Sequence, residues 1–583
     1  MNNKTDKGDF TRSMFFRSVL LSPFAGLGLA LAEIGDAIIV GHGIGMPAIA
    51  AVGYLSPLFL LISFIAFGMS TGGAIFYNDF MNEGKKDKAL DIFNTFVVVT
   101  LIISIFIPLI ILPMQDSFLQ LLGADPKDGK VYDMAKSYLF FIVLGGPFEI
   151  ISEVLSAYLR NDRDVTFSIV VQTLCGISNL IISAILLFFF DWGIAGCSFG
   201  FFISNAAAAL ITVIYIIHTK GDLEFRAHFV GLKKLFKPIR LGFATSTEYI
   251  FGAVFSLIFI HVLSDMSGVE GVGIYSIIEN ISLVFIFMFE FIGKTAQPIF
   301  TAYHSEHNKS ELRRIFSYCA VYSVIIGIVF SAVVLLYPQV MNLLFGMEDV
   351  RDVSSVYHAA KVFGSGAIFM GISLLLQNLI QSMGNDKGVF ALVFMRQIGF
   401  SVPILLILSL FGADAVWFVY PITELLSQTV LFIFERIRES KSRVKERAVY
   451  CTSFWVNKEN VFCELDSVEA FLSEQHIEKS RRERLRLSLE EIFGAIYENA
   501  KKRKKILAQL TMIEDDEGFI EVHLRNNAKE YDIFPELPEK LTSMPETLDN
   551  SKINSLGLLV VKYYSRNLLY RNYQGFNTLT YRI

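Results

Sequence analysis

Long apolar stretches recur along the first 440 residues, and a short polar run bounds each of them. A helix of roughly 20 residues crosses about 30 Å of hydrocarbon, and each stretch is long enough for that. The first stretch, from Leu20, lacks a small-residue cleavage site and continues into a full span, so we expect no cleavable signal. The pattern predicts an all-α, polytopic membrane region with twelve transmembrane helices. We place them at 16–41, 48–79, 91–113, 131–158, 165–189, 193–217, 239–263, 270–299, 315–337, 355–382, 388–410 and 414–435.

The last 130 residues or so have a different pattern, in which amphipathic helices are mixed with alternating strands. Helices are predicted over 467–474, 482–500 and 556–564. Strands are predicted over 519–524 and 578–583. This order of elements is typical of an α+β domain.

Composition divides the chain in the same way. Its 583 residues have a mean hydropathy of +0.50 and a net charge of −5 at pH 7. The first 440 residues hold 62 of the 107 charged residues and the last 143 hold 45, so the charged fractions are about 14% and about 31%, compared with a soluble norm of about 25%. An ordinary soluble enzyme is excluded, and the net charge indicates no nucleic-acid partner. The five cysteines form no CxxC pair or metal-ligand spacing, so we expect neither disulfides nor a metal site.

Basic residues mark every second loop of the membrane region. Lys4 and Arg12 precede the first span, Lys85 and Lys88 follow the second, and Arg226 lies in the basic loop after the sixth. Because basic residues in short loops favour the cytoplasm, both termini and the α+β domain are predicted to be cytoplasmic. The expected location is the plasma membrane of a bacterial cell.

The loop after the sixth span divides the membrane region into two halves that resemble each other. An Asn-Asp pair follows the fourth span at Asn161 and recurs 224 positions later at Asn385, after the tenth. Two six-helix bundles of the same orientation imply a central cleft between them. We therefore expect a cytoplasmic N-terminal tail, a first bundle, a cytoplasmic linker loop, a second bundle, a basic juxtamembrane linker and an α+β domain, at 1–14, 15–217, 218–238, 239–436, 437–455 and 456–583.

An ordered set of motifs lies at 36–45, 49–53, 68–73, 82–85, 159–162, 193–196, 296–299 and 377–384. This set resembles the MATE (multidrug and toxic compound extrusion) family over residues 12–440, and within it the bacterial MepA-like and DinF-like branches. The resemblance implies a secondary active antiporter that exports small lipophilic cations in exchange for H+ or Na+ by alternating access. It implies no required cofactor and no enzyme activity.

The same resemblance places an acidic cation-coupling site at Asp36. Glu33 is three positions earlier, so both carboxylates lie on one face of a helix. Mutual repulsion makes such a pair hold one proton tightly, and the same oxygens suit Na+. The alternative is that Asp36 only caps a helix or meets a polar partner in the bundle.

Further coupling residues follow from the resemblance or from depth in the membrane. Asn179 matches the Asn of the family's Asn-x-x-x-Asp pattern, but its Asp position holds Ser183. One carboxylate fewer favours H+ over Na+. Asn205 is a possible ligand by its depth. Glu248 is a candidate because it lies on span seven, where some family members use a glutamate for cation coupling. The predicted coupling set is thus Asp36, Glu33, Asn179, Asn205 and Glu248.

Other membrane carboxylates are possible cleft residues, because an ionisable group at membrane depth tends to face a cavity or a partner. Glu149 and Glu153 lie one turn apart on span four, and Glu279 lies on span eight. These three would attract cationic cargo, or they would only satisfy nearby polar groups. Glu290 and Lys294 are spaced i,i+4, which predicts that they neutralise each other.

The α+β domain resembles the GHKL ATP-binding fold, and especially the anti-sigma-factor serine kinases. Glu491, Asn526 and Gly557 match its three nucleotide-binding boxes. The Asn that would hold Mg²⁺ is replaced by Ala495, which offers no oxygen ligand. Asn526 stands where an aspartate would bind adenine, so a charge-assisted hydrogen bond is lost. We expect a degenerate pseudo-ATPase domain that binds ATP weakly or not at all.

Two other functions stay open from the sequence. One is a membrane-anchored serine kinase or anti-sigma-like signalling protein whose transporter half acts as a sensor, and the other is a lipid-precursor flippase. The expected partners are small-molecule xenobiotics, the lipid bilayer and a regulatory protein that meets the C-terminal domain.

Overall fold

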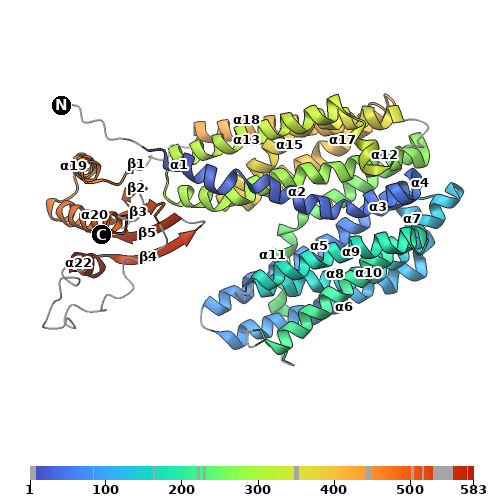
Figure 1. Ribbon diagram of the computed structural model, residues 1–583, viewed down its shortest axis with the longest axis horizontal. Helices are drawn as coiled ribbons and strands as arrows, with labels where there is room; N and C mark the ends of the chain where they lie inside the picture. Colours follow the sequence, from blue (N-terminus) through green and yellow to red (C-terminus); the bar gives the residue numbers. More distant parts are fainter. Residues whose placement is uncertain are drawn as a thin grey trace.

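The protein consists of a long helical region with a small sheet domain at one end (Figure 1). It is described by a computed structural model that covers residues 8–82, 85–161, 165–219, 223–226, 231–346, 353–441, 448–500, 505–514, 518–528, 556–573 and 576–583. Asp162 of the first Asn-Asp pair and part of the basic linker, residues 442–447, lie outside these ranges.

Ten helices in the described part are long and apolar enough to cross a membrane, where the sequence predicts twelve. The first predicted span consists of two short helices, which meet at Ile34, and the seventh and eighth are merged into one helix of 59 residues. The helical elements of this region are α1 (Phe10–Met14), η1 (Phe15–Val19), α2 (Ser22–Glu33), α3 (Gly35–Ile44), α4 (Met46–Gly53), α5 (Ser56–Asn82), α6 (Lys86–Ile111), η2 (Leu112–Met114), α7 (Gln115–Leu121), η3 (Pro126–Asp128), α8 (Lys130–Asn161), α9 (Val165–Phe188), α10 (Gly193–His218), α11 (Leu232–Thr245), α12 (Thr247–Ser305), α13 (Lys309–Leu336), α14 (Val340–Phe345), α15 (Val353–Ser382), α16 (Asp386–Phe394), η4 (Met395–Gly399), α17 (Ser401–Ser409), η5 (Val416–Phe418) and α18 (Val419–Lys441).

Helix α12 is broken inside at Gly268. Its φ of 60° and ψ of −149° lie in a region that is open essentially to glycine alone. The chain therefore changes direction there without a connecting loop. The two segments on either side of Gly268 correspond to the seventh and eighth predicted spans.

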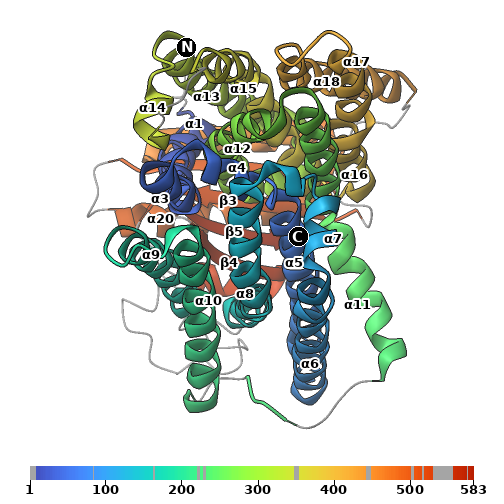
Figure 2. The ribbon, with the colours of Figure 1, turned by 90° about the vertical axis from the view of Figure 1, so that its right-hand side faces the viewer.

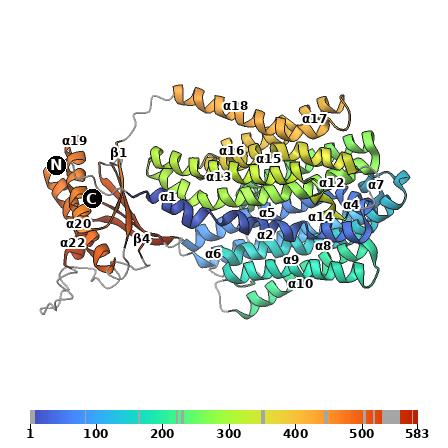
Figure 3. The same ribbon diagram turned by 45° about the horizontal axis from the view of Figure 1, so that its top comes forward.

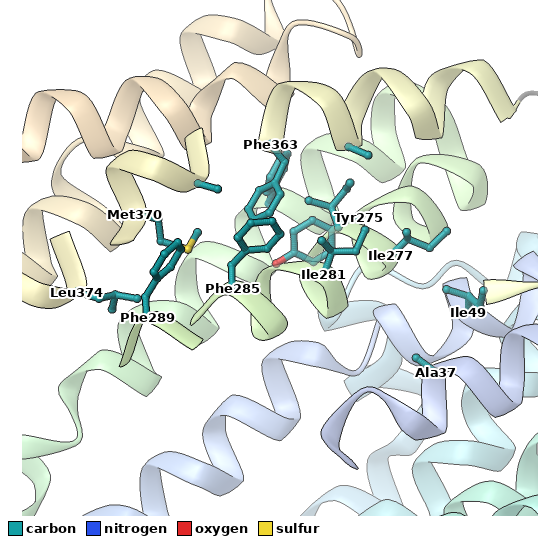
Figure 4. Packing of buried hydrophobic residues seen from close by; sticks show 14 of the residues in the cluster. Ala37, Ile49, Tyr275, Ile277, Ile281, Phe285, Phe289, Phe363, Met370 and Leu374 are labelled. Atoms are coloured by element: carbon teal, nitrogen blue, oxygen red, sulfur yellow. The ribbon is translucent and has the colours of Figure 1, made fainter. Parts of the chain in front are cut away.

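The helices form two groups when the molecule is viewed along its length (Figure 2). Helices α6, α8, α9 and α10 lie in one group, and α13, α15, α17 and α18 lie in the other. Helix α2 of the first half packs against α12 of the second. Aromatic rings fill the core of the second group, where Phe285 of α12 meets Phe363 of α15 edge to face with ring centroids 5.6 Å apart (Figure 4).

Two short elements, η1 and η4, are π-helical turns. A π-turn inserts one extra residue into a helix and rotates the side chains that follow it, and such turns are frequent at functional sites. In η4 the backbone N–H of Phe400 donates to the carbonyl of Met395 at 2.9 Å, and the hydroxyl of Ser401 donates to the carbonyl of Arg396.

The described residues of the C-terminal domain form a five-stranded antiparallel sheet in the order β1-β2-β3-β5-β4, with helices on one face. Its apolar core joins α20 to the sheet through residues such as Leu489, Phe493 and Val522. The elements are β1 (Val449–Trp455), α19 (Lys458–Glu474), α20 (Lys479–Ala500), β2 (Leu507–Glu514), β3 (Ile520–Asn526), α22 (Leu556–Tyr564), β4 (Arg566–Tyr573) and β5 (Phe576–Arg582).

The three helices and two strands predicted here are present, but β1, β2 and β4 were missed. The sheet begins at Val449, within the segment predicted as linker, and α19 begins nine residues earlier than expected. Strand β2 is buried at every position except Glu514, so its burial does not alternate, although apolar and polar residues alternate over 508–512. One face of β2 packs under the helices, and the other turns toward the membrane region.

The helix-free face of the sheet lies against the end of the helical region, where α1 reaches it (Figure 3). The ring of Phe10 in α1 packs edge to face on Phe576 of β5 with centroids 5.4 Å apart. Residues 10–14 of the predicted N-terminal tail, 1–14, are therefore the helix α1, which fills the junction between the two regions.

Candidate functional site

A buried carboxylate lies where the first span is interrupted. Asp36 is in the first turn of α3, two residues after the break at Ile34. The amide of Asn179 in α9 donates to Asp36 Oδ2 at 2.8 Å, and the Ser183 hydroxyl donates to Asn179 Oδ1 at 3.3 Å. Asp36 Oδ1 is buried and has no hydrogen-bond partner among the described residues. The site thus offers one free carboxylate oxygen.

Glu33 and Glu149 extend this acidic site. Glu33 ends α2, and its charge interacts with those of Asp36 and Glu149. One carboxylate oxygen of Glu149, Oε2, is buried without a hydrogen-bond partner in the part of the chain described. Glu153 differs from both, because it forms an ion pair with Arg160 at 2.8 Å. Three acidic side chains therefore share one region, while Glu153 is neutralised.

Asn205 is not brought into contact with Asp36. Its amide nitrogen donates to the carbonyl of Phe201 at 3.1 Å, and its oxygen accepts from the thiol of Cys175 at 3.6 Å. The position of Asn205 is set by its own helix, α10, and by α9. Among the described residues, the predicted first-half set thus has one hydrogen bond to Asp36, from Asn179, and the role of Asn205 stays a prediction.

Each predicted acidic residue of the second half has a hydrogen-bond or ion-pair partner. Glu248, at the start of α12, accepts a hydrogen bond from the Gln377 amide at 2.9 Å. Glu279 accepts one from the Ser56 hydroxyl of α5, so it joins the two halves of the region. Glu290 and Lys294 form the expected ion pair at 2.7 Å, which confirms that they neutralise each other.

Arg396 was missed by sequence reasoning. It lies in the π-turn η4 and pairs with Glu424 of α18 at 2.7 Å, with side chains only 9% and 10% exposed. A single arginine in the apolar stretch 388–410 was the available signal, since a charge at membrane depth requires a partner. The sequence did not identify that partner.

Of the three residues predicted to form a nucleotide site, Asn526 forms hydrogen bonds within the C-terminal domain. The Oδ1 atom of Asn526 accepts hydrogen bonds from the backbone N–H of Ala528 and from the Asn577 amide, both at 3.1 Å. Burial and the neighbouring Glu490 raise the pKa of Glu491 in α20. Gly557 lies in the first turn of α22. The Asn526 oxygen that would bind the adenine amino group therefore already accepts hydrogen bonds from the domain itself.

The sheet domain is joined to the membrane region by a buried ion pair. Arg525 of β3 donates two hydrogen bonds to the carboxylate of Glu306, which directly follows α12. These side chains are 5% and 1% exposed. His523 Nδ1 lies 3.5 Å from the same carboxylate. The hydroxyl of Tyr303 donates to Gln509 of β2 at 3.0 Å and is 2.7 Å from the Thr11 hydroxyl.

These features define a class of protein: a polytopic membrane transporter with a docked soluble domain. The helical groups hold carboxylates within their apolar spans, and a search of the described residues for clusters of His, Cys, Asp and Glu that could bind a metal found none. A family model described as MatE matches residues 24–185 and 244–407, which together are more than half of the chain. The chain therefore belongs to the MATE family, whose members are transporters and not enzymes.

Curated relatives and solved structures agree with this family. The multidrug export protein MepA of Staphylococcus aureus (strain NCTC 8325 / PS 47) is 23% identical over 384 residues, which cover 63% of this chain and 81% of that protein. The protein of the same name from Staphylococcus saprophyticus is 21% identical over 374 residues with the same coverage.

Two solved structures share the fold. An inward-facing multidrug resistance MATE family transporter of the MOP superfamily aligns with a TM-score of 0.66 at 19% identity, over 72% of this chain and 98% of that one. An outward-facing structure described in the same words aligns with a TM-score of 0.58 at 19% identity, over 74% and 97%.

Proposed function

We propose that this protein exports small lipophilic cations in exchange for H+ or Na+ by alternating access. The observation that carries the proposal is the Asp36 carboxylate, whose Oδ2 accepts from Asn179 while Oδ1 has no hydrogen-bond partner in the described residues. An ionised carboxylate at membrane depth is costly without a partner. A proton or a small cation at Oδ1 supplies that partner, so occupancy of the site follows the cation gradient. The absence of a second carboxylate at Ser183 favours H+.

We further propose twelve membrane crossings in two bundles of six, with both termini in the cytoplasm. Helices α2 and α3 count as one crossing, and the two segments of α12 around Gly268 count as two. The basic loops support the orientation. The contact between Phe10 and Phe576 supports a common side for both ends of the chain. The membrane is the plasma membrane of a bacterial cell.

The cargo is proposed from charge and aromatic surface. Glu33 and Glu149 lie in the first half and Glu279 in the second. The Ser56 hydroxyl donates to Oε2 of Glu279, and the other oxygen, Oε1, is the one proposed to face a cation. Phe67 of α5 stacks on Tyr249 of α12 with ring centroids 4.9 Å apart, at the contact of the two halves. Aromatic faces bind organic cations, and an apolar site with a few acids is typical of drug binding.

The test is efflux of ethidium from proteoliposomes under separately imposed H+ and Na+ gradients. We expect wild-type efflux to follow one of the gradients and Asp36→Asn to abolish that dependence. Asp116→Asn is the matched control, because Asp116 is an exposed acid paired with Lys136 and is expected to keep the coupling. Undiminished gradient-dependent efflux by Asp36→Asn contradicts the assignment of Asp36.

We also propose that the C-terminal domain is a GHKL-like pseudo-ATPase that regulates transport from the cytoplasmic side, alone or with a protein partner. The internal bonding of Asn526 and the substitution at Ala495 support the loss of nucleotide binding. Calorimetry of the full chain with Mg-ATP is expected to show no binding at micromolar concentration. Micromolar binding with phosphate transfer to a protein supports the signalling alternative instead.

A further inference from the structure

A chain of largely buried polar groups links four elements in the second half of the membrane region. It begins at Glu248 of α12, passes through Gln377 of α15 and Arg396 of η4, and ends at Glu424 of α18. Four elements that are distant in sequence contribute one residue each. Buried polar networks of this kind restrict geometry strongly, because each lost partner leaves a costly unsatisfied group.

The geometry fixes the direction of each hydrogen bond. Arg396 Nε lies 3.1 Å from both oxygens of Glu424, and Nη2 lies 2.7 Å from Oε1. Arg396 Nη1 donates to Gln377 Oε1 at 3.3 Å, and Gln377 Nε2 donates to Glu248 Oε2 at 2.9 Å. Since a guanidinium only donates and a carboxylate only accepts, the amide of Gln377 has one orientation that satisfies both.

The charges of this network do not balance. Arg396 carries one positive charge, and Glu248 and Glu424 carry two negative charges when both are ionised. Glu290 and Lys294 also interact with Glu248, but they form their own ion pair at 2.7 Å. The bidentate contact assigns Arg396 to Glu424, so Glu248 is the carboxylate left without a counter-charge.

We propose that Arg396 is a positioning residue that sets the cation affinity of Glu248, with Glu424 as the competing carboxylate. While Glu248 holds a cation, Arg396 forms its ion pair with Glu424. When the cation leaves, Arg396 is shared with Glu248 through Gln377, which stabilises the empty carboxylate. The extra residue of the π-turn η4 gives this arginine its inward position. This inference rests on the proposed function, because it assumes that cations drive the transport.

A merely structural ion pair between η4 and α18 predicts something different. Loss of either member would then weaken folding or efflux in the same direction, with no effect on the protonation of Glu248. The competition for Arg396 instead predicts opposite effects. Without Glu424, Arg396 interacts with Glu248 alone and stabilises its ionised form. Without Arg396, the ionised Glu248 lies near the unpaired negative charge of Glu424, which destabilises that form.

The experiment measures the pH profile of ethidium efflux from proteoliposomes, with size-exclusion chromatography as the check on folding. We expect Glu424→Gln to move the midpoint to lower pH by about 1 unit and Arg396→Gln to move it to higher pH by a similar amount. The double variant Arg396→Gln/Glu424→Gln restores the charge balance of the wild type, so its midpoint returns to within about 0.5 unit. If Arg396→Gln does not fold, the shift of Glu424→Gln and its reversal in the double variant carry the test. Arg396→Lys keeps the charge, so its midpoint is expected to stay closer to the wild type than that of Arg396→Gln.

The pair Glu290→Gln/Lys294→Gln is the matched control, because it removes a balanced ion pair beside Glu248. Its midpoint is expected to stay at the wild-type value. Shifts of both single variants in one direction, or no shift in either, overturn the role of Arg396. A wild type whose efflux follows no cation gradient overturns the proposed function and this inference with it, whereas normal coupling with unmoved midpoints overturns this inference alone.

Discussion

The hydrogen bond from Asn179 to Asp36 ties the fifth predicted span to the first. It also favours the ionised form of Asp36, because an amide donor stabilises a carboxylate more than a neutral acid. The acidic member of this site was predictable from a motif. Which oxygen is bonded and which is free follows only from how α3 and α9 pack.

Replacing Asn179 with alanine tests this bond. A hydrogen bond to a charged group contributes about 1.5–3 kcal/mol, which corresponds to about 1–2 pH units. Without the donor the carboxylate holds its proton to higher pH, so the midpoint of the efflux profile is expected to rise by that amount. Asn205→Ala is the control and should leave the midpoint in place, since Asn205 bonds to Phe201 and Cys175. Equal shifts in both variants would show that the bond to Asp36 is not the cause.

His523 gives the docked sheet domain a dependence on pH. Burial lowers its pKa below the usual 6.5, although the carboxylates of Glu306 and Glu521 partly oppose this. A histidine with a lower pKa in the folded chain binds fewer protons when folded, so stability falls as the pH drops below about 6.5, by at most about 1.4 kcal/mol per pH unit. We expect His523→Gln to reduce the difference in thermal unfolding between pH 7.5 and 5.5. The exposed His476→Asn should retain it.

At the scale of elements, long apolar helices were well predicted because length and hydropathy suffice for them. The sequence did not predict where the helices are interrupted or which elements contact one another. The break at Ile34 and the π-turn around Arg396 depend on packing and leave no periodic signal. Strand β2 has a short alternation of apolar and polar residues over 508–512, so a strand signal was present and was missed. Its polar residues Gln509 and Thr511 are buried, which the alternation does not predict.

The break in α12 is the clearest test at this scale. Gly268→Ala places a Cβ on a residue with φ 60° and ψ −149°, which costs about 1–3 kcal/mol. We expect a lower unfolding temperature and slower efflux, measured on purified protein and in proteoliposomes. Gly176→Ala is the control in α9, where a Cβ meets nothing within 4 Å and removal of a helical glycine stabilises by about 0.5–1 kcal/mol. If both variants lose stability equally, the conformation of Gly268 is not responsible.

At the scale of the whole molecule, Arg525 and Glu306 hold the sheet domain against the membrane region. Breaking a buried ion pair by removing one partner costs about 3–5 kcal/mol, because it leaves an uncompensated charge. Arg525→Gln is therefore expected to release the domain, seen as faster limited proteolysis, and to change the efflux rate. Arg486→Gln is the control, since its partner Asp466 lies in the same domain. Release without any change in efflux would leave the domain without a regulatory role.

Glu306 directly follows the helix that also carries Glu248, Gly268 and Glu279. If docking of the sheet domain changes the affinity for a cation or a drug, linkage requires that the cation or drug change the strength of docking by the same factor. A fluorophore on the sheet domain would then report binding events inside the membrane. The sheet domain would respond to the amount of bound substrate, and this response could be followed without measuring transport.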